Sequence, residues 1–424
     1  MEKEKVLLVI VDYKKKDSWA AEDVGEELAE LVQGCRGEVE EKVFCKIDKP
    51  TAACLIGSGK VEEIAQMCAE ASIDTVVFSE DLKGSQQRNL ENIIKVKTID
   101  RTQLILDIFA RHATSQEGKM QVELAQLQYL LPRLVGKGIA LSRLGGGIGT
   151  LGPGETKLEV DRRRIAQRIS KLKKELQNVG ENRALKRRKR KEKGVPMISL
   201  VGYTNAGKST LLNILTEAGQ ETRDGLFTTL DPLSRKLVLP NNIKVVLSDT
   251  VGFMHKLPLH LIEAFKATLE EVVEADLLLH VLDVSHPRYR NLYDSVLEVL
   301  KELGADQKPV ITVLNKIDKM EDASWLKELS RTFELPVEVS AKTGENLENC
   351  LEMIGRKLSA LIVNVDMFIP INRMNLINEA HNEGQVFFVK YYNDLIHIRA
   401  ALPKKLAGLL RKARVSQKRP KSKD

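Results

Sequence analysis

The stretch Gly202-Tyr-Thr-Asn-Ala-Gly-Lys-Ser209 decides the fold class, because it fits the phosphate-binding pattern G-x-x-x-x-G-K-[S/T]. An apolar, β-branched run at 197–201 precedes it, and residues 210–216 are typical of a helix. In this setting the backbone N–H groups of the loop point at phosphates, Lys208 supplies a positive charge and the Ser209 hydroxyl ligates Mg²⁺. The flanking patterns disfavour the alternative of a chance glycine-rich turn.

A second motif, Asp249-Thr-Val-Gly252, follows another apolar strand pattern at 243–248. Asp249 is suited to hold Mg²⁺, directly or through water. Gly252 allows a backbone N–H to approach a γ-phosphate, as switch segments require. The motif therefore predicts a nucleoside triphosphate with its metal.

The base-reading motifs favour guanine over adenine. Asn315-Lys-Ile-Asp318 ends a third strand pattern, and the Asp318 carboxylate can accept hydrogen bonds from N1–H and the 2-amino group of guanine. Adenine lacks that donor pair. Ser340-Ala-Lys342 has the form of a loop whose backbone N–H contacts the guanine oxygen. Because ligands bind at the carboxyl ends of strands in open α/β sheets, these motifs together predict a GTP-binding G domain.

Two further features bear on hydrolysis. Phe253 stands where many GTPases have a glutamine that orients the attacking water, so we expect slow hydrolysis by the isolated protein. Asn205 occupies a loop position that is associated with K⁺ beside the phosphates in some GTPases; the alternative is that it only shapes the loop. An upstream threonine must also reach Mg²⁺ and the γ-phosphate. The candidates are Thr222, Thr228 and Thr229, unless these hydroxyls only cap a turn before Pro232.

Composition indicates a cytoplasmic protein of two to four domains in its 424 residues. We expect no stable membrane insertion, because no apolar run approaches the length of a span and Met1–Lys5 lacks a signal-peptide pattern. The five cysteines form no C-x-x-C pair and suit reduced, buried thiols. His280, within an apolar run, is expected to be a packed core histidine.

The net charge of +7 is unevenly distributed. Residues 157–193 hold sixteen Lys and Arg against five Asp and Glu, and residues 403–424 hold nine against one. This concentration indicates a nucleic-acid partner, with RNA favoured for the dense run at 184–193. A solvated helix face with a disordered tail is the alternative, and it is favoured for 418–424 alone.

The region before the G domain divides into two patterns. Residues 1–110 alternate strand-like runs, at 6–11 and 75–78, with helical ones, at 19–32 and 61–71, and so predict a small α/β domain. Within it, Ile56-Gly-Ser-Gly-Lys60 lacks the spacing of a phosphate loop and is expected to be a turn before a helix.

Two heptad-like patterns follow, at 119–135 and 155–193, and predict an antiparallel helical hairpin. The second arm is one continuous helix unless it breaks at Gly180. The arms are joined by a glycine-rich segment at 136–154. So many glycines suit close backbone approach or a shape fixed on binding, although a flexible linker is the alternative.

The chain resembles the HflX family of ribosome-associated GTPases from about residue 50 to 345. The motifs that carry the resemblance are Gly57-Ser-Gly-Lys-Val-Glu-Glu-Ile64, Gly145-Gly-Gly-Ile-Gly-Thr-Leu-Gly-Pro-Gly-Glu-Thr156 with Asp161-Arg-Arg163, the stretch Gly202–Thr210, Phe227-Thr-Thr-Leu-Asp-Pro232, and the segment 249–268. One position departs from the family pattern: Leu151 stands where the family usually has Arg before Gly-Pro-Gly.

The resemblance implies a GTPase that binds the large ribosomal subunit and its RNA near the peptidyl-transferase region and splits or rescues stalled ribosomes. It selects Thr229 as the switch threonine, and it implies a secondary ATPase activity in the amino-terminal domain of some members. We expect a monomer that does not bind DNA. The other reading of the chain is a regulatory GTP switch that acts on protein partners, with RNA binding incidental.

The expected fold is α/β, with a P-loop G domain preceded by a small α/β domain and a helical hairpin and followed by a small carboxy-terminal α/β module. The expected boundaries are 1–113, 114–193, 194–362 and 363–424. Residues expected to bind GTP, with Mg²⁺ and K⁺ as the candidate ions, are Gly202, Tyr203, Thr204, Asn205, Ala206, Gly207, Lys208, Ser209, Thr210, Phe227, Thr228, Thr229, Asp249, Thr250, Val251, Gly252, Asn315, Lys316, Ile317, Asp318, Ser340, Ala341 and Lys342. The expected metal ligands are Ser209, Thr229 and Asp249, and the expected catalytic residues are Lys208, Thr229 and Gly252.

Overall fold

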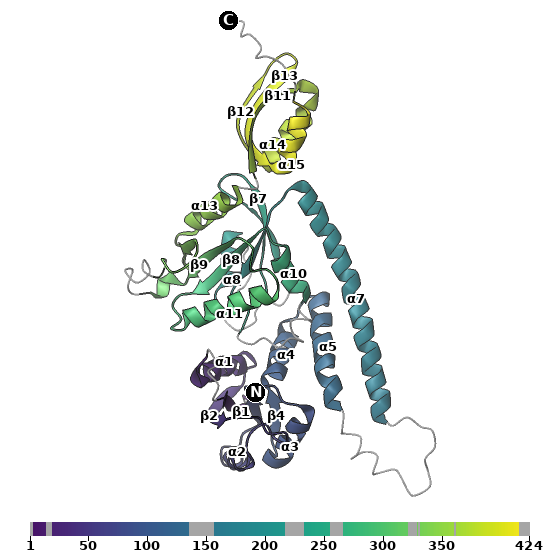
Figure 1. The fold of residues 1–424 in the computed structure, drawn as a ribbon, viewed down its shortest axis with the longest axis vertical. Helices are drawn as coiled ribbons and strands as arrows, with labels where there is room; N and C mark the ends of the chain where they lie inside the picture. Colours follow the sequence, from purple (N-terminus) through teal and green to yellow (C-terminus); the bar gives the residue numbers. More distant parts are fainter. Residues whose placement is uncertain are drawn as a thin grey trace. The chain divides into compact units, whose positions relative to one another are not determined.

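The computed structural model describes residues 3–13, 19–134, 157–216, 233–254, 266–320, 329, 331–359 and 362–414. The chain forms two compact units, one built on residues up to Gly180 and the other on most residues from Glu181 onward. Both units mix helices with strands (Figure 1). The glycine-rich segment 136–154 and the candidate switch threonines lie outside the described residues.

The amino-terminal part is a four-stranded parallel sheet in the order β2-β1-β3-β4. Its central strand β1 is buried from Val6 to Val11, as expected for a parallel strand covered on both faces. The small α/β domain predicted from sequence is confirmed. Its elements are β1 (Lys5–Tyr13), α1 (Ala21–Gly34), β2 (Glu38–Ile47), α2 (Ser58–Glu70), β3 (Thr75–Phe78), α3 (Gly84–Ile94), β4 (Lys97–Asp100) and α4 (Arg101–His112).

The predicted helical hairpin consists of α5 (Gln116–Leu130), a 3₁₀ turn η1 (Leu131–Leu134) and α7 (Lys157–Lys193). Helix α7 runs through Gly180 without a break, so the break considered from sequence does not occur. The two arms meet where Arg168 donates two hydrogen bonds of 2.6 Å to the Glu123 carboxylate. Leu172, on the heptad seam of α7, is fully buried.

The G domain is a six-stranded sheet in the order β10-β9-β8-β5-β7-β6, parallel except for the β6–β7 pair. Its core is rich in Leu, Ile and Val from these strands and from α8 and α13. The elements are β5 (Met197–Val201), α8 (Lys208–Leu215), β6 (Ser234–Val238), β7 (Lys244–Ser248), α10 (Lys266–Glu274), β8 (Leu277–Asp283), α11 (Tyr289–Glu302), β9 (Val310–Asn315), η2 (Ile317–Lys319), β10 (Pro336–Glu338) and α13 (Leu347–Leu358).

The carboxy-terminal module is an antiparallel sheet in the order β11-β13-β12, with two helices packed on one face. It is the small carboxy-terminal α/β module expected from the sequence. The elements are β11 (Ile362–Pro370), η4 (Ile371–Arg373), α14 (Met374–Glu383), β12 (Gln385–Tyr391), β13 (Leu395–Pro403) and α15 (Lys404–Lys412).

Two further expectations concern the cysteines and membrane-spanning helices. All five cysteines are free, and burial raises the pKa of the Cys350 thiol to about 12 and that of Cys35 to about 11. Such thiols are poor nucleophiles and suit packing. Among the described helices, none combines the length and the apolar character that crossing a bilayer needs.

Candidate nucleotide site and its surroundings

The phosphate loop lies between the buried strand β5 and helix α8, which begins at Lys208. Gly207 caps this helix with a φ of 93°, a left-handed conformation that strains other residues. A Cβ on Gly207 would come within 2.3 Å of the Asn315 amide nitrogen. The second glycine of the motif is therefore required both by the backbone turn and by a side chain packed against it.

The Lys208 amine is buried within the loop. Its Nζ donates to the carbonyls of Gly202 at 3.0 Å and Tyr203 at 2.7 Å. Burial lowers the pKa of Lys208 to about 8; the nearby Asp249 carboxylate opposes this shift and Lys316 adds to it. This position lets the amine charge face an anion held by the loop.

The metal-ligand candidates are adjacent in space. The Ser209 hydroxyl donates to the Asp249 carboxylate at 2.6 Å, although the two residues are 40 positions apart. Both supply hard oxygen ligands of the kind Mg²⁺ prefers, so their placement fits that ion. The third candidate, Thr229, lies outside the described residues.

The segment after Asp249 lies against the phosphate loop. Thr204 N–H donates to the Phe253 carbonyl at 2.8 Å, and Phe253 N–H donates to the Gly202 carbonyl at 3.0 Å. A Cβ on Gly252 would lie 2.9 Å from the Thr204 Cα and 3.1 Å from the Lys208 Nζ. Only glycine allows this approach without a shift of the loop. Phe253 itself is 1% exposed, so its side chain packs in the core.

The base-reading motifs converge at the ends of β9 and β10. Ser340 donates its hydroxyl to the Asp318 Oδ1 at 2.6 Å, which fixes the carboxylate and leaves Oδ2 as a further acceptor. The Asn315 amide donates to the Ala206 carbonyl at 2.8 Å, and its Oδ1 accepts from Ala341 N–H at 2.9 Å. One side chain thus joins the phosphate loop to both base-reading segments.

Sequence reasoning missed Asp283, the last residue of β8. Its carboxylate forms an ion pair of 2.7 Å with the Lys316 Nζ, and both side chains are largely buried. Lys316 has a φ of 66°, so this pair holds the strained residue that begins the Lys316–Lys319 turn. The only signal in the sequence is an aspartate at the carboxyl end of a strand.

His280 is a packed core residue, as predicted. It is fully buried on β8 and stacks on Tyr293 with ring centroids 4.6 Å apart. Burial, with a smaller contribution from the Lys208 charge, lowers its pKa to about 3. The ring is therefore neutral at physiological pH.

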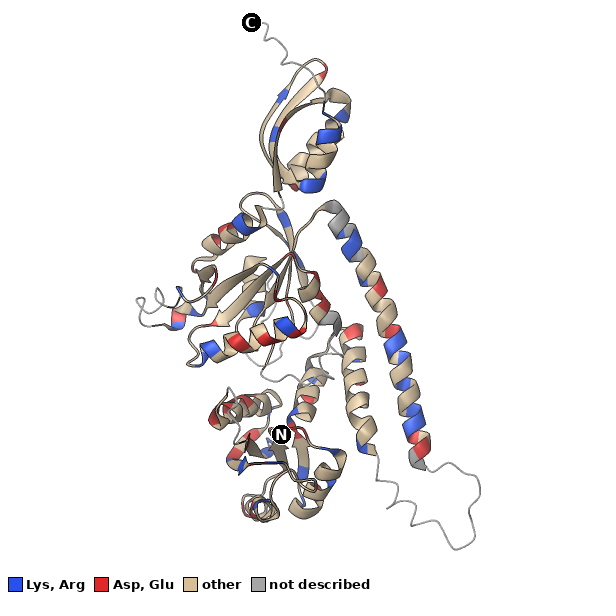
Figure 2. Ribbon diagram, in the orientation of Figure 1, with Lys and Arg blue, Asp and Glu red and all other residues tan. Residues whose placement is uncertain are grey.

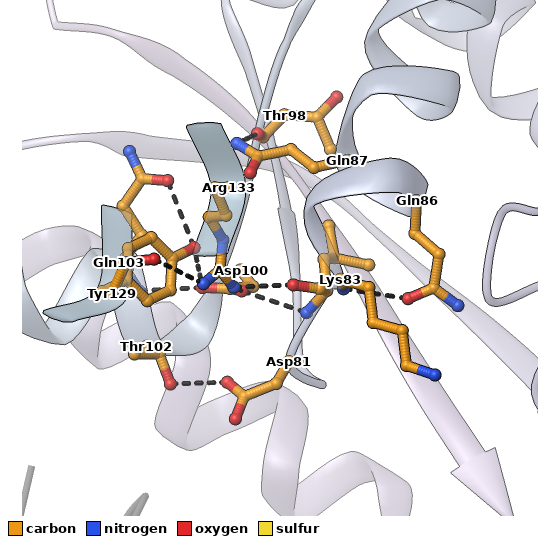
Figure 3. Close-up of polar contacts among 11 residues, drawn as sticks. Asp81, Lys83, Gln86, Gln87, Thr98, Asp100, Thr102, Gln103, Tyr129 and Arg133 are labelled. Carbon is orange, nitrogen blue, oxygen red and sulfur yellow. Dashed lines mark hydrogen bonds and ion pairs between the residues drawn. The ribbon is translucent and has the colours of Figure 1, made fainter. Parts of the chain in front are cut away.

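A second polar cluster lies in the amino-terminal unit and is shown in Figure 3. The fully buried Asp100 accepts hydrogen bonds from Tyr129 at 2.8 Å and Arg133 at 3.0 Å, and from the backbone of Leu82 and Gln103. Burial raises the pKa of Asp100, while these hydrogen bonds and the Arg133 charge lower it.

The Arg133 guanidinium also donates to the Leu82 carbonyl at 2.6 Å and lies 3.3 Å from the Tyr129 ring centroid. Arg133 lies in η1, three residues before the glycine-rich segment at 136–154. Through Arg133, the cluster therefore anchors η1, the end of the first hairpin arm, to the amino-terminal domain.

Basic residues are frequent along α7 (Figure 2). Not all of them face solvent: Arg187 forms ion pairs with Glu270 at 3.0 Å and Glu271 at 3.5 Å, on helix α10. Lys173 and Lys174 are exposed. The basic run predicted to bind RNA thus contains at least one cation that serves the fold.

A sheet of this order with a phosphate loop, an Asp-x-x-Gly segment and an Asn-Lys-x-Asp segment at its carboxyl edge defines a P-loop GTPase. Family models match along the chain: "GTP-binding GTPase N-terminal" at residues 22–110, "GTP-binding GTPase Middle Region" at 112–190 and "50S ribosome-binding GTPase" at 197–316.

The chain is 44% identical over 410 residues to the GTPase HflX of Caldanaerobacter subterraneus subsp. tengcongensis, covering 97% of this chain and 94% of that protein. It is 41% identical over 348 residues to the GTPase HflX of Escherichia coli, covering 81% of each. The chain belongs to the HflX family of GTPases. A solved GTP-binding protein from Sulfolobus solfataricus in complex with GDP is 28% identical, with a TM-score of 0.43, over 84% of this chain and 99% of that one.

Proposed function

We propose that this GTPase binds the large ribosomal subunit and uses a GTP-dependent conformational change to split or rescue stalled ribosomes. The observation that carries the proposal is the 37-residue basic helix α7, which follows the glycine-rich segment and is separated by three residues from β5 of the G domain. Long cationic helices bind phosphates without reading sequence, as ribosomal RNA binding requires. The family that matches residues 197–316, "50S ribosome-binding GTPase", supports the same partner.

In this proposal each group of site residues has a separate role in binding or hydrolysing GTP. Lys208 and the backbone of Gly252 face the outer phosphates, Asp318 reads guanine, and Ser209, Asp249 and Thr229 hold Mg²⁺. The ion, when bound, neutralises charge that develops on the phosphates. Because the buried Phe253 side chain cannot orient water, hydrolysis by the isolated protein should be slow. A faster rate then requires a further group at the phosphates, which is supplied by a partner, by another side chain or by K⁺ near Asn205.

The proposal extends to a cytoplasmic monomer whose RNA partner is ribosomal and which does not bind DNA. The proposed domains keep the boundaries 1–113, 114–193, 194–362 and 363–424. We do not extend the proposal to ATP hydrolysis by the amino-terminal domain. Within the described structure Gly57 only precedes helix α2, and Lys60 is ion-paired at 2.6 Å with Glu63 on the same helix.

The test is sedimentation of the full chain with intact ribosomes and with separated subunits, in GTP and in GDP. We expect GTP-dependent binding to the large subunit and loss of intact ribosomes from sucrose gradients. A triple substitution of Gly145, Gly146 and Gly147 by Ala should leave GTP hydrolysis nearly intact and abolish splitting, because glycine conformations are lost. Intact ribosomes in every condition, with protein partners captured instead, would favour the regulatory switch.

A further inference from the structure

The carboxy-terminal sheet has two different faces. Along β11 and β13 buried residues alternate with exposed or half-buried ones, and the buried set packs under α14 and α15. The opposite face carries Asp366 and Phe368 from β11, and His397 and Arg399 from β13. This second face, which we call the open face, is distinct from the nucleotide site.

Aromatic rings form a continuous row on the open face. Phe368 lies opposite His397 in the strand register, and their rings stack with centroids 4.4 Å apart and 15° between planes. Phe388 on β12 meets the edge of His397 at 5.2 Å, and Tyr392, just after β12, lies 6.0 Å from Phe368. The row therefore crosses all three strands.

The row is most accessible on β12. Phe388 is 42% exposed, which is unusual for a phenylalanine in a strand of a packed module, whereas Phe368 and His397 are half-buried. Aromatic rings gathered on a surface mark interaction sites, because their apolar faces gain from being covered. Bases of single-stranded nucleic acid provide such a cover, since each base has a flat face that stacks on an aromatic ring.

The charges beside the rings favour a polyanion. Arg399 is 59% exposed at its side chain, and Lys390, opposite His397 in the register, is also exposed. The carboxylate on this face, Asp366, contacts His397 at 2.6 Å and Arg399 at 3.2 Å. The hydrogen bond from His397 is the main reason that the pKa of Asp366 is lowered. The acid is thus balanced locally, and Lys390 remains as an exposed cation beside the rings.

We infer that the open face binds single-stranded RNA, with unpaired bases stacked on Phe388, Phe368 and His397 and with phosphates near Lys390 and Arg399. RNA-binding modules use exposed aromatics on a sheet in this way to stack two or three bases. A duplex hides its base faces, so unpaired nucleotides are required. The choice of RNA over DNA rests on the proposed ribosomal function; the stacking site does not.

The experiment measures binding of the full chain to a short oligoribonucleotide that carries the fluorescent base 2-aminopurine, whose emission falls on stacking. Phe388→Ala should weaken binding by roughly 5- to 150-fold and reduce the quenching, as expected for loss of one stacked base. Phe388→Trp should retain both. The matched control is Tyr391→Ala: Tyr391 is 53% exposed on the same strand, but its register partner Ile396 faces the helices.

GTP affinity should be unchanged in every variant, which shows that the G domain is folded, and the retained binding of Phe388→Trp and Tyr391→Ala shows that the module is folded. Arg399→Gln, a second variant that leaves the ring row in place, should lower the salt dependence of binding. Unchanged affinity and quenching in Phe388→Ala, or equal binding of duplex RNA, would overturn the inference. Equal affinity for single-stranded DNA of the same sequence would overturn the assignment to RNA.

Because α7 is also basic, Lys173→Glu with Lys174→Glu serves as a further control. At saturating protein this double variant should show normal quenching, whatever its affinity, and loss of quenching there would place the bases on α7 instead. The assay contains no ribosomes, so a failure of ribosome splitting and a failure of base stacking are separate results.

Discussion

The Asn315 amide nitrogen lies 2.8 Å from the Ala206 carbonyl oxygen, which joins two nucleotide motifs that are 109 positions apart. The same side chain accepts the Ala341 N–H at 2.9 Å and is 1% exposed. A buried side chain that hydrogen-bonds to two loops fixes their relative position. Asn315 therefore acts on the nucleotide by holding the phosphate loop in register with the base-reading loop.

Replacing Asn315 by Ala should weaken GTP and GDP alike. The change leaves the Ala206 carbonyl and the Ala341 N–H without their partner, and we take the cost to nucleotide binding as that of one unpaired buried group, about 1–3 kcal/mol. We expect affinity to fall by roughly 5- to 150-fold, measured by titration of a fluorescent guanine nucleotide. Asn375→Ala, at an exposed position of α14, is the control and should change nothing. Loss of base preference without loss of affinity would contradict this positioning role.

Base choice should depend on Asp318. Ser340 donates to its Oδ1 at 2.6 Å, which fixes the carboxylate, and both oxygens can still accept hydrogen bonds from guanine. Asp318→Asn replaces an acceptor pair by a donor and an acceptor, which should weaken GTP by about 1–3 kcal/mol and admit xanthine nucleotides. Competition between GTP and XTP for the variant measures this. Ser340→Ala should weaken both nucleotides without changing the preference. Unchanged GTP affinity in Asp318→Asn would refute the assignment.

If Asn205 helps to hold K⁺, hydrolysis should be faster in KCl than in NaCl. The backbone of Asn205 has a φ of 60°, which Asn and Gly tolerate better than Ala does. Asn205→Gly is therefore the informative variant: it removes the side chain without backbone strain, and it should erase the difference between the salts. Asn346→Gly is a matched control, since Asn346 has a φ of 59° at the start of α13. Equal rates of the unaltered protein in both salts would leave Asn205 as a residue that shapes the loop.

The elements and the site differ in how far the sequence determines them. Strands such as β1 contain continuous apolar runs and can be predicted, whereas β2 mixes exposed charges with half-buried residues, because it is an edge strand. The motif residues lie at strand ends where a parallel sheet places them. Pairing across the chain is different: nothing in the spacing predicts that Asp283 meets Lys316, or that Asp100 meets Arg133. Those contacts depend on how the strands and helices assemble.

The buried His280 ring predicts a pH dependence of stability. Its pKa in the folded chain is about 3, against about 6.5 when unfolded, so the unfolded state binds more protons between these values. Stability therefore falls as the pH decreases through this window, by up to about 1.4 kcal/mol per pH unit. His280→Leu should reduce this slope, measured by chemical unfolding followed through nucleotide release at about pH 5 to about pH 7. The exposed His381→Gln should leave the slope unchanged.

The basic helix should separate into cations that serve the fold and cations that bind RNA. Arg187 pairs with Glu270 and with Glu271, which is only 5% exposed, so Arg187→Gln leaves a buried carboxylate without its partner. We expect it to destabilise the G domain by about 1–3 kcal/mol. Lys173→Glu with Lys174→Glu changes only exposed charges. This pair should leave stability intact, weaken ribosome binding and lower its log–log salt dependence by about 0.7–0.9 for each phosphate that the helix no longer binds. Thermal unfolding and ribosome sedimentation across salt concentrations distinguish the two classes. If both variants weakened ribosome binding equally at full stability, the division along the helix proposed here would be wrong.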